Sequence, residues 1–409
     1  MGYIFLLSRK NYSVSLLFLY CFGGWFSVKA QTSFQNFFVK NSQYLLETTL
    51  TVRPYSRDSL WVVVGFPLAD SLKLLPDEQR VALHLTVYLQ SNNKHPFREY
   101  SFSFNQYVGA ESIGGNWGSV ASKIPIPPEY FTIESELTIL KLKGYNRFYS
   151  AHPASFRWNL SVVTPQNQPL SFYNDSIRID NSGKQVLVDE YMIINKLPNP
   201  PYSVFRRKNI VLQPTIHNKV LPTPIKYFPN NAGGVILKNN TADTLNCLLF
   251  FGNADFPEPT TLFELINPLG YICSSSEMRY FREDPSKRKL DEFWLDVGGN
   301  AARARERISV FYEQVAMSNR LFTDFRPGYL TDRGMIRCVF GRPDAIIYQP
   351  NKEIWIYEAI PGQTNSTKFT FIRYPHQLTA NYFEVVRDPS YETLWFQTIN
   401  NLRNGIIKK

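Results

Sequence analysis

Aliphatic side chains occupy every second position of residues 81–90, which read Val-Ala-Leu-His-Leu-Thr-Val-Tyr-Leu-Gln. Successive side chains of a β-strand point to opposite faces, so this pattern predicts a strand with one buried face and one polar face. Residues 156–162 repeat the alternation, and residues 59–66 form the more continuous apolar run of a central strand. Because Pro, Gly, Asn and Asp lie between these runs, we expect residues 31–195 to form an antiparallel β-sandwich.

The length of the chain requires more than one domain. At 409 residues it exceeds what one ordinary hydrophobic core contains, so two or three domains are expected. Residues 197–201, Leu-Pro-Asn-Pro-Pro, are the clearest linker, because proline cannot join a central ladder and stiffens a connection. Shorter β segments then predict a second small β domain over residues 202–275, followed by an α+β domain over residues 276–409. The expected fold class is therefore multidomain and mostly β.

The last part of the chain has helical periodicity. Leu290, Phe293 and Trp294 fit one face of a helix. A longer helix is predicted by a mostly apolar stripe at spacings of three and four, which runs from Ile308 to Ala316 and ends with the polar Asn319. A final helix is expected to begin with Asp388 as N-cap and to stop at Gly405. Short strands are expected around residues 335–340, 345–348, 353–359, 368–374 and 380–387.

The N-terminus has the layout of a signal peptide. Arg9 and Lys10 precede an uncharged apolar run at residues 14–26, and Val28-Lys29-Ala30 places a small residue directly before a cleavage site. Residues 1–30 are therefore expected to be removed between Ala30 and Gln31, since the apolar run is short for a spanning helix. An uncleaved membrane anchor is the alternative.

The rest of the sequence indicates whether the exported chain is attached to a membrane. Cys21 follows the bulky Tyr20, which argues against lipid modification at this cysteine. No later segment is long and apolar enough to span a bilayer, so the mature chain should be soluble or held by partners. The expected localisation is periplasmic or outer-membrane-associated, and a helix rather than a β-sorting domain at the end of the chain favours the periplasm.

The balance of charge is basic, with a formal net charge of +10 at pH 7. The basic residues are scattered or form short runs such as residues 206–208 and 287–289, which are usually solvated faces. An exported chain rarely meets nucleic acid, so we expect no nucleic-acid partner. A polysaccharide or an anionic surface is the more plausible charged partner.

Three cysteines follow the expected signal peptide. Cys247 and Cys273 could form a disulfide if they share a sheet, although a small and odd count is not a disulfide framework. Cys338 alternates with Ile336 and Phe340, which predicts a buried and inert thiol.

Four short motifs follow one another in the C-terminal region. They are residues 319–322 (Asn-Arg-Leu-Phe), 326–334 (Arg-Pro-Gly-Tyr-Leu-Thr-Asp-Arg-Gly), 341–344 (Gly-Arg-Pro-Asp) and 353–357 (Glu-Ile-Trp-Ile-Tyr). In this order they resemble the GWxTD domain of exported Bacteroidota proteins, named for its Gly-Trp-x-Thr-Asp core, over about residues 276–405. Tyr329 replaces the Trp of that name, which keeps an aromatic ring but not an indole N–H. The resemblance implies a fold and a compartment and supplies no established activity.

Turn chemistry explains the residue types of these motifs. Gly328 can adopt a positive φ after Pro327, Thr331 and Asp332 can accept backbone N–H groups, and Arg333 can pair with Asp332, Asp344 or Glu353. The alternative is that Asp332, Arg333 and Asp344 converge as a ligand-binding or hydrolytic site. The motif residues that are structural or bind a ligand are Gly328, Tyr329, Thr331, Asp332, Arg333, Gly341, Pro343, Asp344 and Trp355.

No other catalytic signature is evident in the sequence. It contains no zinc-protease, serine-hydrolase or phosphate-loop motif, and its five histidines are far apart, so we expect no metal and no cofactor. Trp117 follows the Gly-rich residues 109–116 and could be an exposed platform for a glycan, although a plain long β-connection explains the segment better.

These observations favour an exported, non-enzymatic scaffold or interaction protein of the bacterial cell envelope that binds envelope proteins. A glycan- or peptide-binding module is the first alternative, and a hydrolase with a site near Asp332, Arg333 and Asp344 is the second.

Overall fold

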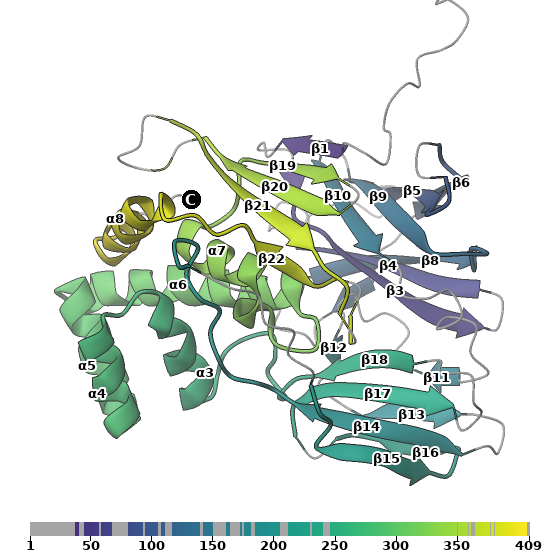
Figure 1. Ribbon diagram of the computed structural model, residues 1–409, viewed down its shortest axis with the longest axis horizontal. Helices are drawn as coiled ribbons and strands as arrows, with labels where there is room; N and C mark the ends of the chain where they lie inside the picture. Colours follow the sequence, from purple (N-terminus) through teal and green to yellow (C-terminus); the bar gives the residue numbers. More distant parts are fainter. Residues whose placement is uncertain are drawn as a thin grey trace, which may run out of the picture.

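The computed structural model describes most of the chain after residue 36. The described residues are 37–40, 45–56, 59–67, 81–92, 95–104, 108–110, 117–139, 142–149, 161–163, 172–173, 176–180, 185–204, 212–229, 231–239, 246–349, 351–358, 360, 365–376, 378–379 and 381–406. The expected signal peptide and its cleavage site between Ala30 and Gln31 lie outside them, as does most of the predicted strand at residues 156–162. Figure 1 shows the helices to the left, one set of strands to the upper right and a second set below.

The first set of strands forms the β-sandwich that the alternating pattern predicts. One sheet has the order β2-β10-β9-β5-β6 and the other β3-β4-β8-β7. Strand β5 covers the alternating segment, and β4 lies between β3 and β8 as a central strand. The strands are β2 (Leu45–Leu46), β3 (Thr49–Ser56), β4 (Ser59–Pro67), β5 (Val81–Leu89), β6 (Arg98–Phe104), β7 (Val108–Ala110), β8 (Trp117–Pro125), β9 (Phe131–Ile139) and β10 (Leu142–Tyr149).

Aliphatic side chains from both sheets fill the space between them. Leu83 and Leu85 of β5 face Val62 and Val64 of β4 in one buried cluster. The even and odd positions of β5 differ in burial at its start, where Ala82 is exposed and Leu83 is buried. Burial of this inner face is the main stabilisation of a sandwich.

The second set of strands also forms two packed sheets. Their orders are β11-β13-β16 and β12-β18-β17-β14-β15, and they enclose a cluster that includes Ile179, Val188 and Leu237. The strands are β11 (Ser161–Val163), β12 (Phe172–Tyr173), β13 (Ile177–Asp180), β14 (Val186–Met192), β15 (Ile216–Leu221), β16 (Ile225–Tyr227), β17 (Gly233–Asn239) and β18 (Asn246–Phe251).

This pairing corrects the expected domain boundaries. Strand β14 pairs with β15 and β17, so a boundary between residues 195 and 202 would cut one sheet. The second β domain begins near β11, well inside the range expected for the first. Residues 197–201 are not a free linker either: Leu197 and Tyr202 pack on the C-terminal core, and the Asp388 N–H donates to the Pro201 carbonyl (2.9 Å).

The C-terminal domain has the expected α+β composition. Its sheet has the order β1-β19-β20-β21-β22, and its first strand comes from the opposite end of the chain. The elements are β1 (Phe37–Lys40), α3 (Leu262–Ile266), η2 (Asn267–Tyr271), α4 (Ser275–Glu283), α5 (Lys287–Gly298), α6 (Ala301–Phe322), η3 (Gly328–Leu330), α7 (Asp332–Phe340), β19 (Ala345–Gln349), β20 (Lys352–Tyr357), β21 (Thr367–Arg373), β22 (Phe383–Val385) and α8 (Tyr391–Arg403).

One of the predicted strands is a helix. Residues 335–340 lie in α7, whose N-cap is Thr331, and the Thr331 side chain accepts the Gly334 N–H. All residues from Gly334 to Phe340 are buried, so the segment has no polar face to reveal a helical period. The alternation of Ile336, Cys338 and Phe340 therefore does not reflect a strand, although Cys338 is fully buried as expected.

The last helix is close to its prediction. It begins after Ser390, and Asp388 caps the preceding turn by accepting the Ser390 N–H at 2.8 Å. Gly405 follows it with φ of 76°, the left-handed conformation that ends a helix. Among the residues that the structure describes, no helix is long and apolar enough to cross a membrane.

Candidate functional site at residues 328–334

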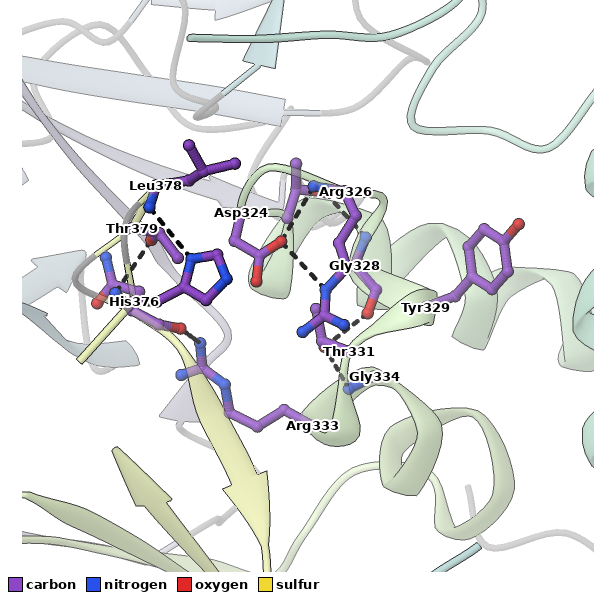
Figure 2. Close-up of polar contacts among 12 residues, drawn as sticks. Asp324, Arg326, Gly328, Tyr329, Thr331, Arg333, Gly334, His376, Leu378 and Thr379 are labelled. Carbon is purple, nitrogen blue, oxygen red and sulfur yellow. Dashed lines mark hydrogen bonds and ion pairs between the residues drawn. The ribbon is translucent and has the colours of Figure 1, made fainter. Parts of the chain in front are cut away.

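The motif at residues 328–334 joins α6 to α7 through the short helix η3 (Figure 2). Its two glycines allow backbones to touch. A Cβ on Gly328 would lie 1.8 Å from the Ser318 carbonyl oxygen of α6, and a Cβ on Gly334 would lie 2.0 Å from the Gly328 carbonyl oxygen. Both positions therefore require glycine because of close approach, whereas the expectation for Gly328 was a positive φ.

Thr331 closes the turn, as the sequence predicts. Its hydroxyl donates to the Gly328 carbonyl at 2.7 Å and accepts the Gly334 N–H at 3.0 Å. Figure 2 shows these two bonds at the start of α7. The residue is a helix N-cap, which explains why a short hydroxyl side chain is needed here.

Asp332 bonds to the sheet rather than to its own turn. Its Oδ2 accepts the N–H of Val385 at 2.8 Å, and both carboxylate oxygens accept from the Arg387 guanidinium at 2.9 Å. Val386, the next residue, bonds inward to Thr370 of β21, so the Val385 N–H points away from the sheet. Asp332 thus occupies the outer edge of β22.

Arg333 reaches the neighbouring strands. Its Nη1 donates to Glu353 of β20 at 3.1 Å, and its Nη2 donates to the Asn381 carbonyl at 3.3 Å. Its guanidinium also lies over the ring of Phe383, 4.2 Å from the centroid. Of the three acidic partners that the sequence left open, Glu353 is the one that Arg333 pairs with.

Trp355 uses the second oxygen of the same carboxylate. Its indole N–H donates to Glu353 Oε2 at 3.2 Å, and its ring packs against Phe322 and Phe371 in the buried core. Glu353 therefore joins Arg333 of α7 to Trp355 within the sheet.

The motif at residues 341–344 is a separate turn. Gly341 has φ of 71° and ends α7, while its carbonyl accepts the Tyr357 hydroxyl at 3.0 Å. Pro343 is buried in this turn. The Asp344 carboxylate accepts the Glu358 N–H at 2.6 Å. Asp332, Arg333 and Asp344 thus bond to different strands and turns.

Tyr329 is buried beneath η2, where its backbone and side chain are both bonded. Its hydroxyl accepts from the Asn267 amide at 3.0 Å, and its carbonyl accepts the Tyr271 hydroxyl at 2.6 Å. Its N–H donates to Asn319 of α6 at 3.2 Å. Burial raises the pKa of Tyr329 to about 12, so its hydroxyl stays protonated. The hydroxyl is an acceptor here, a role that an indole N–H could not take.

A second group of polar residues beside the motif was not predicted. Asp324 is buried and accepts the Arg326 N–H at 3.0 Å, with the Arg326 side chain 3.4 Å away. Burial raises the pKa of Asp324, although the positive charge of Arg326 opposes that rise. The ring of His376 stacks on that of Phe325, with their centroids 4.6 Å apart. The His376 Nδ1 accepts the Leu378 N–H (Figure 2). The sequence signals were that Arg326 opens the quoted segment 326–334 and that Asp324 lies two residues before it.

Another unpredicted pair joins α7 to the first sandwich. Arg337 donates to both carboxylate oxygens of Glu47, with Nη2 3.0 Å from Oε2, and its Nε donates to Gln314 at 2.9 Å. Arg342 lies 3.6 Å from the same carboxylate. Burial alone would raise the pKa of Glu47, but the two guanidinium charges and the bonds from Arg337 outweigh it and lower the pKa.

Two candidate site residues have other environments than expected. Trp117 is 4% exposed within β8, and the guanidinium of Arg320 lies 5.7 Å from its ring centroid, so Trp117 is not an exposed glycan platform.

Cys273 lies after η2 outside the sheet that contains Cys247, and it is a free thiol. The disulfide between them is therefore not formed. Within the described ranges, no three His, Cys, Asp or Glu side chains are grouped as metal ligands.

Two β-sandwiches packed on an α+β domain define a multidomain, mostly β protein. The family model of the GWxTD domain matches residues 233–404, so this chain contains a GWxTD domain. The match begins at β17 and therefore includes two strands of the second sandwich as well as the C-terminal helices and most of their sheet.

Other comparisons add no function. No curated protein matches the chain. Among solved structures, a glycosyl hydrolase family 2 member from Bacteroides cellulosilyticus has 12% identity and a TM-score of 0.18 over 35% of this chain, and red sea bream transglutaminase has 7% identity and a TM-score of 0.17 over 51%. The chain spans 17% and 31% of their respective lengths. At these scores neither likeness carries an argument about fold or activity.

Proposed function

We propose that this chain is an exported, non-enzymatic scaffold of the bacterial cell envelope whose GWxTD domain holds two β-sandwiches in place for binding envelope proteins. The observation that carries the proposal is that the charged side chains of the motifs bond within their own domain. Asp332, Arg333 and Asp344 each bond to a strand, a loop or a turn of the same domain. These bonds give each residue a structural role without a substrate.

Contacts from the same domain to both sandwiches support a scaffold role. Arg337 of α7 binds Glu47 beside the first sandwich, and Arg320 of α6 covers Trp117 of β8. Leu378, in the loop between β21 and β22, forms a buried apolar cluster with Tyr191 and Ile236 of the second sandwich. Ionic and apolar contacts of this kind fix the relative positions of modules that present binding surfaces.

Export rests on the N-terminal sequence alone. A positive start, an apolar run and a small residue at position 30 are the pattern of a cleaved signal peptide. N-terminal sequencing of the protein from fractionated cells tests this part, and Gln31 is the expected first residue. An intact Met1 in the membrane fraction would instead support the uncleaved anchor.

The scaffold role is tested by affinity purification of the tagged full-length protein from solubilised envelope, with quantitative mass spectrometry. We expect at least one envelope protein in stoichiometric amount. The matched control is the same tagged chain without residues 2–30, which should stay in the cytoplasm and not recover that protein. Recovery of the chain alone, as a monomer, would contradict the proposal.

A conservative variant separates a scaffold from a hydrolase. Asp344→Asn keeps an oxygen that can accept the Glu358 N–H but removes a carboxylate that hydrolysis would need. We expect this variant to recover the same partner and to complement a deletion strain fully. Normal folding and partner recovery with lost complementation would favour the hydrolase.

A further inference from the structure

The two edges of the C-terminal sheet are closed in different ways. At the β22 edge, the Asp332 carboxylate takes the outward N–H of Val385, and Arg387 holds that carboxylate from its other side. A side chain bonded to an edge N–H blocks the addition of another strand there. At the β19 edge, a strand already pairs with the backbone: it is β1, residues 37–40, which lies beside β19 in Figure 1.

Strand β1 differs from the other strands of this sheet in its origin. It pairs antiparallel with β19 in the register Phe37 with Tyr348 through Lys40 with Ala345, although the two strands come from opposite ends of the chain. The next strand, β2, begins only five residues later and belongs to a sheet of the first sandwich. The chain therefore places a short N-terminal strand on one module while its continuation belongs to another.

We propose that the β19 edge is a strand-acceptor site and that β1 of a second copy of this chain can occupy it. Four residues form a short strand, and terminal strands are among the first elements to open. A second copy supplies the same four residues, so exchange recreates every ladder bond in the same register. Exchange of an identical terminal element between copies is a low-cost route to a dimer. The inference concerns self-association and does not depend on the envelope role proposed above.

Cysteine pairs in register test this inference in the full mature chain. Val39 lies opposite Ile346, so chains carrying Val39→Cys are mixed with chains carrying Ile346→Cys under mild oxidation. We expect a disulfide-linked dimer on a non-reducing gel, increasing with protein concentration. The same chain carrying both substitutions should form the disulfide within one molecule at low concentration.

A one-residue offset gives the matched control. Ile347→Cys faces the opposite side of the sheet from Ile346, so its mixture with Val39→Cys should give several-fold less dimer. Each single variant incubated alone measures the background from the native thiols. Lys40→Cys with Ala345→Cys is a second in-register pair, which covers the case in which Ile346→Cys fails to fold.

The inference is overturned if the doubly substituted chain closes only on itself and the mixed chains give no dimer above background. It is also overturned if the Ile347→Cys mixture gives as much dimer as the Ile346→Cys mixture, because no defined ladder would then exist. If strand exchange fails in this way but affinity purification still recovers a stoichiometric envelope protein, the scaffold role stands. Failure of the strand-exchange inference is therefore distinguishable from failure of the proposed function.

Discussion

Asp332 at the start of α7 and Arg387 after β22 are joined by two parallel contacts, Nη1 to Oδ2 and Nη2 to Oδ1, each 2.9 Å long. Both side chains are 8% exposed. The same carboxylate also accepts the Val385 N–H. One acidic residue of the motif therefore bonds both to the edge of a sheet and to a buried arginine, which explains the need for a side chain with two acceptor oxygens at this position.

Asp332→Asn should destabilise the protein strongly. An amide offers one oxygen instead of two and removes the negative charge that both terminal nitrogens of the Arg387 guanidinium contact. Breaking a buried pair in this way costs about 3–5 kcal/mol of the free energy of unfolding. Urea titration followed by circular dichroism measures the change.

Asp291→Asn is the matched control for that prediction. Asp291 pairs with Lys287 on the exposed surface of α5, at 2.6 Å, with both side chains more than half exposed. Surface pairs at this spacing contribute about 0.3–0.5 kcal/mol. A loss at Asp332 no larger than the loss at Asp291 would show that the buried pair is not a structural brace.

Gly328→Ala tests the close approach of the motif to α6. The new methyl group would lie 1.8 Å from the Ser318 carbonyl oxygen, so α6 and η3 would have to separate. We expect a loss of about 3 kcal/mol or more in the free energy of unfolding. Gly299→Ala is the control, because Gly299 has φ of 70° but open space around its Cβ position. Its cost should be about 1–2 kcal/mol, and an equal cost at both positions would contradict the packing argument.

Periodic segments of this fold are predictable from the sequence, and long-range pairing is not. The strand at residues 81–90, the helices around Trp294 and Phe311 and the helix after Asp388 all follow from local alternation or spacing. The pairing of β14 with β15, which crosses the proline-rich residues 197–201, has no local signal. The same is true of β1, whose partner lies near the other end of the chain.

In the candidate site, the sequence likewise predicts the role of a residue type but not its partner in the fold. Thr331 as a helix cap and Arg333 as the partner of an acid follow from side-chain chemistry alone. That Asp332 binds Arg387, and that Arg337 binds Glu47, depends on tertiary contacts that the motif does not encode. Trp117 follows a Gly-rich segment, but it is buried within β8 with the Arg320 guanidinium of α6 over its ring, a contact between distant segments that the local sequence does not indicate.

The Cys338 thiol should be unreactive in the folded protein. It is fully buried, and burial raises its pKa to about 12. Near pH 8 only about one thiol in ten thousand would then be ionised, and the thiolate is the reactive form. Iodoacetamide labelling followed by peptide mass spectrometry should leave the Cys338 peptide unmodified in native protein and modify it within minutes in urea. Rapid labelling in the native state would show that the contact between α6 and α7 opens readily.

Glu47 should make stability depend on pH below its unfolded pKa, 4.5. Its pKa is lower in the folded protein, so its ion pair with Arg337 stabilises fully above pH 4.5 and is lost as pH falls through the folded value. Glu47→Gln should therefore reduce the free energy of unfolding at neutral pH, and its difference from the unsubstituted protein should shrink as pH drops from 4.5. Glu136→Gln, which removes a solvent-exposed pair with Lys143, should cost under about 1 kcal/mol at neutral pH. Urea titrations between neutral pH and pH 3 measure both variants. A Glu47→Gln difference that stays constant across this range would mean that the charge of Glu47 does not contribute to stability through its pair with Arg337.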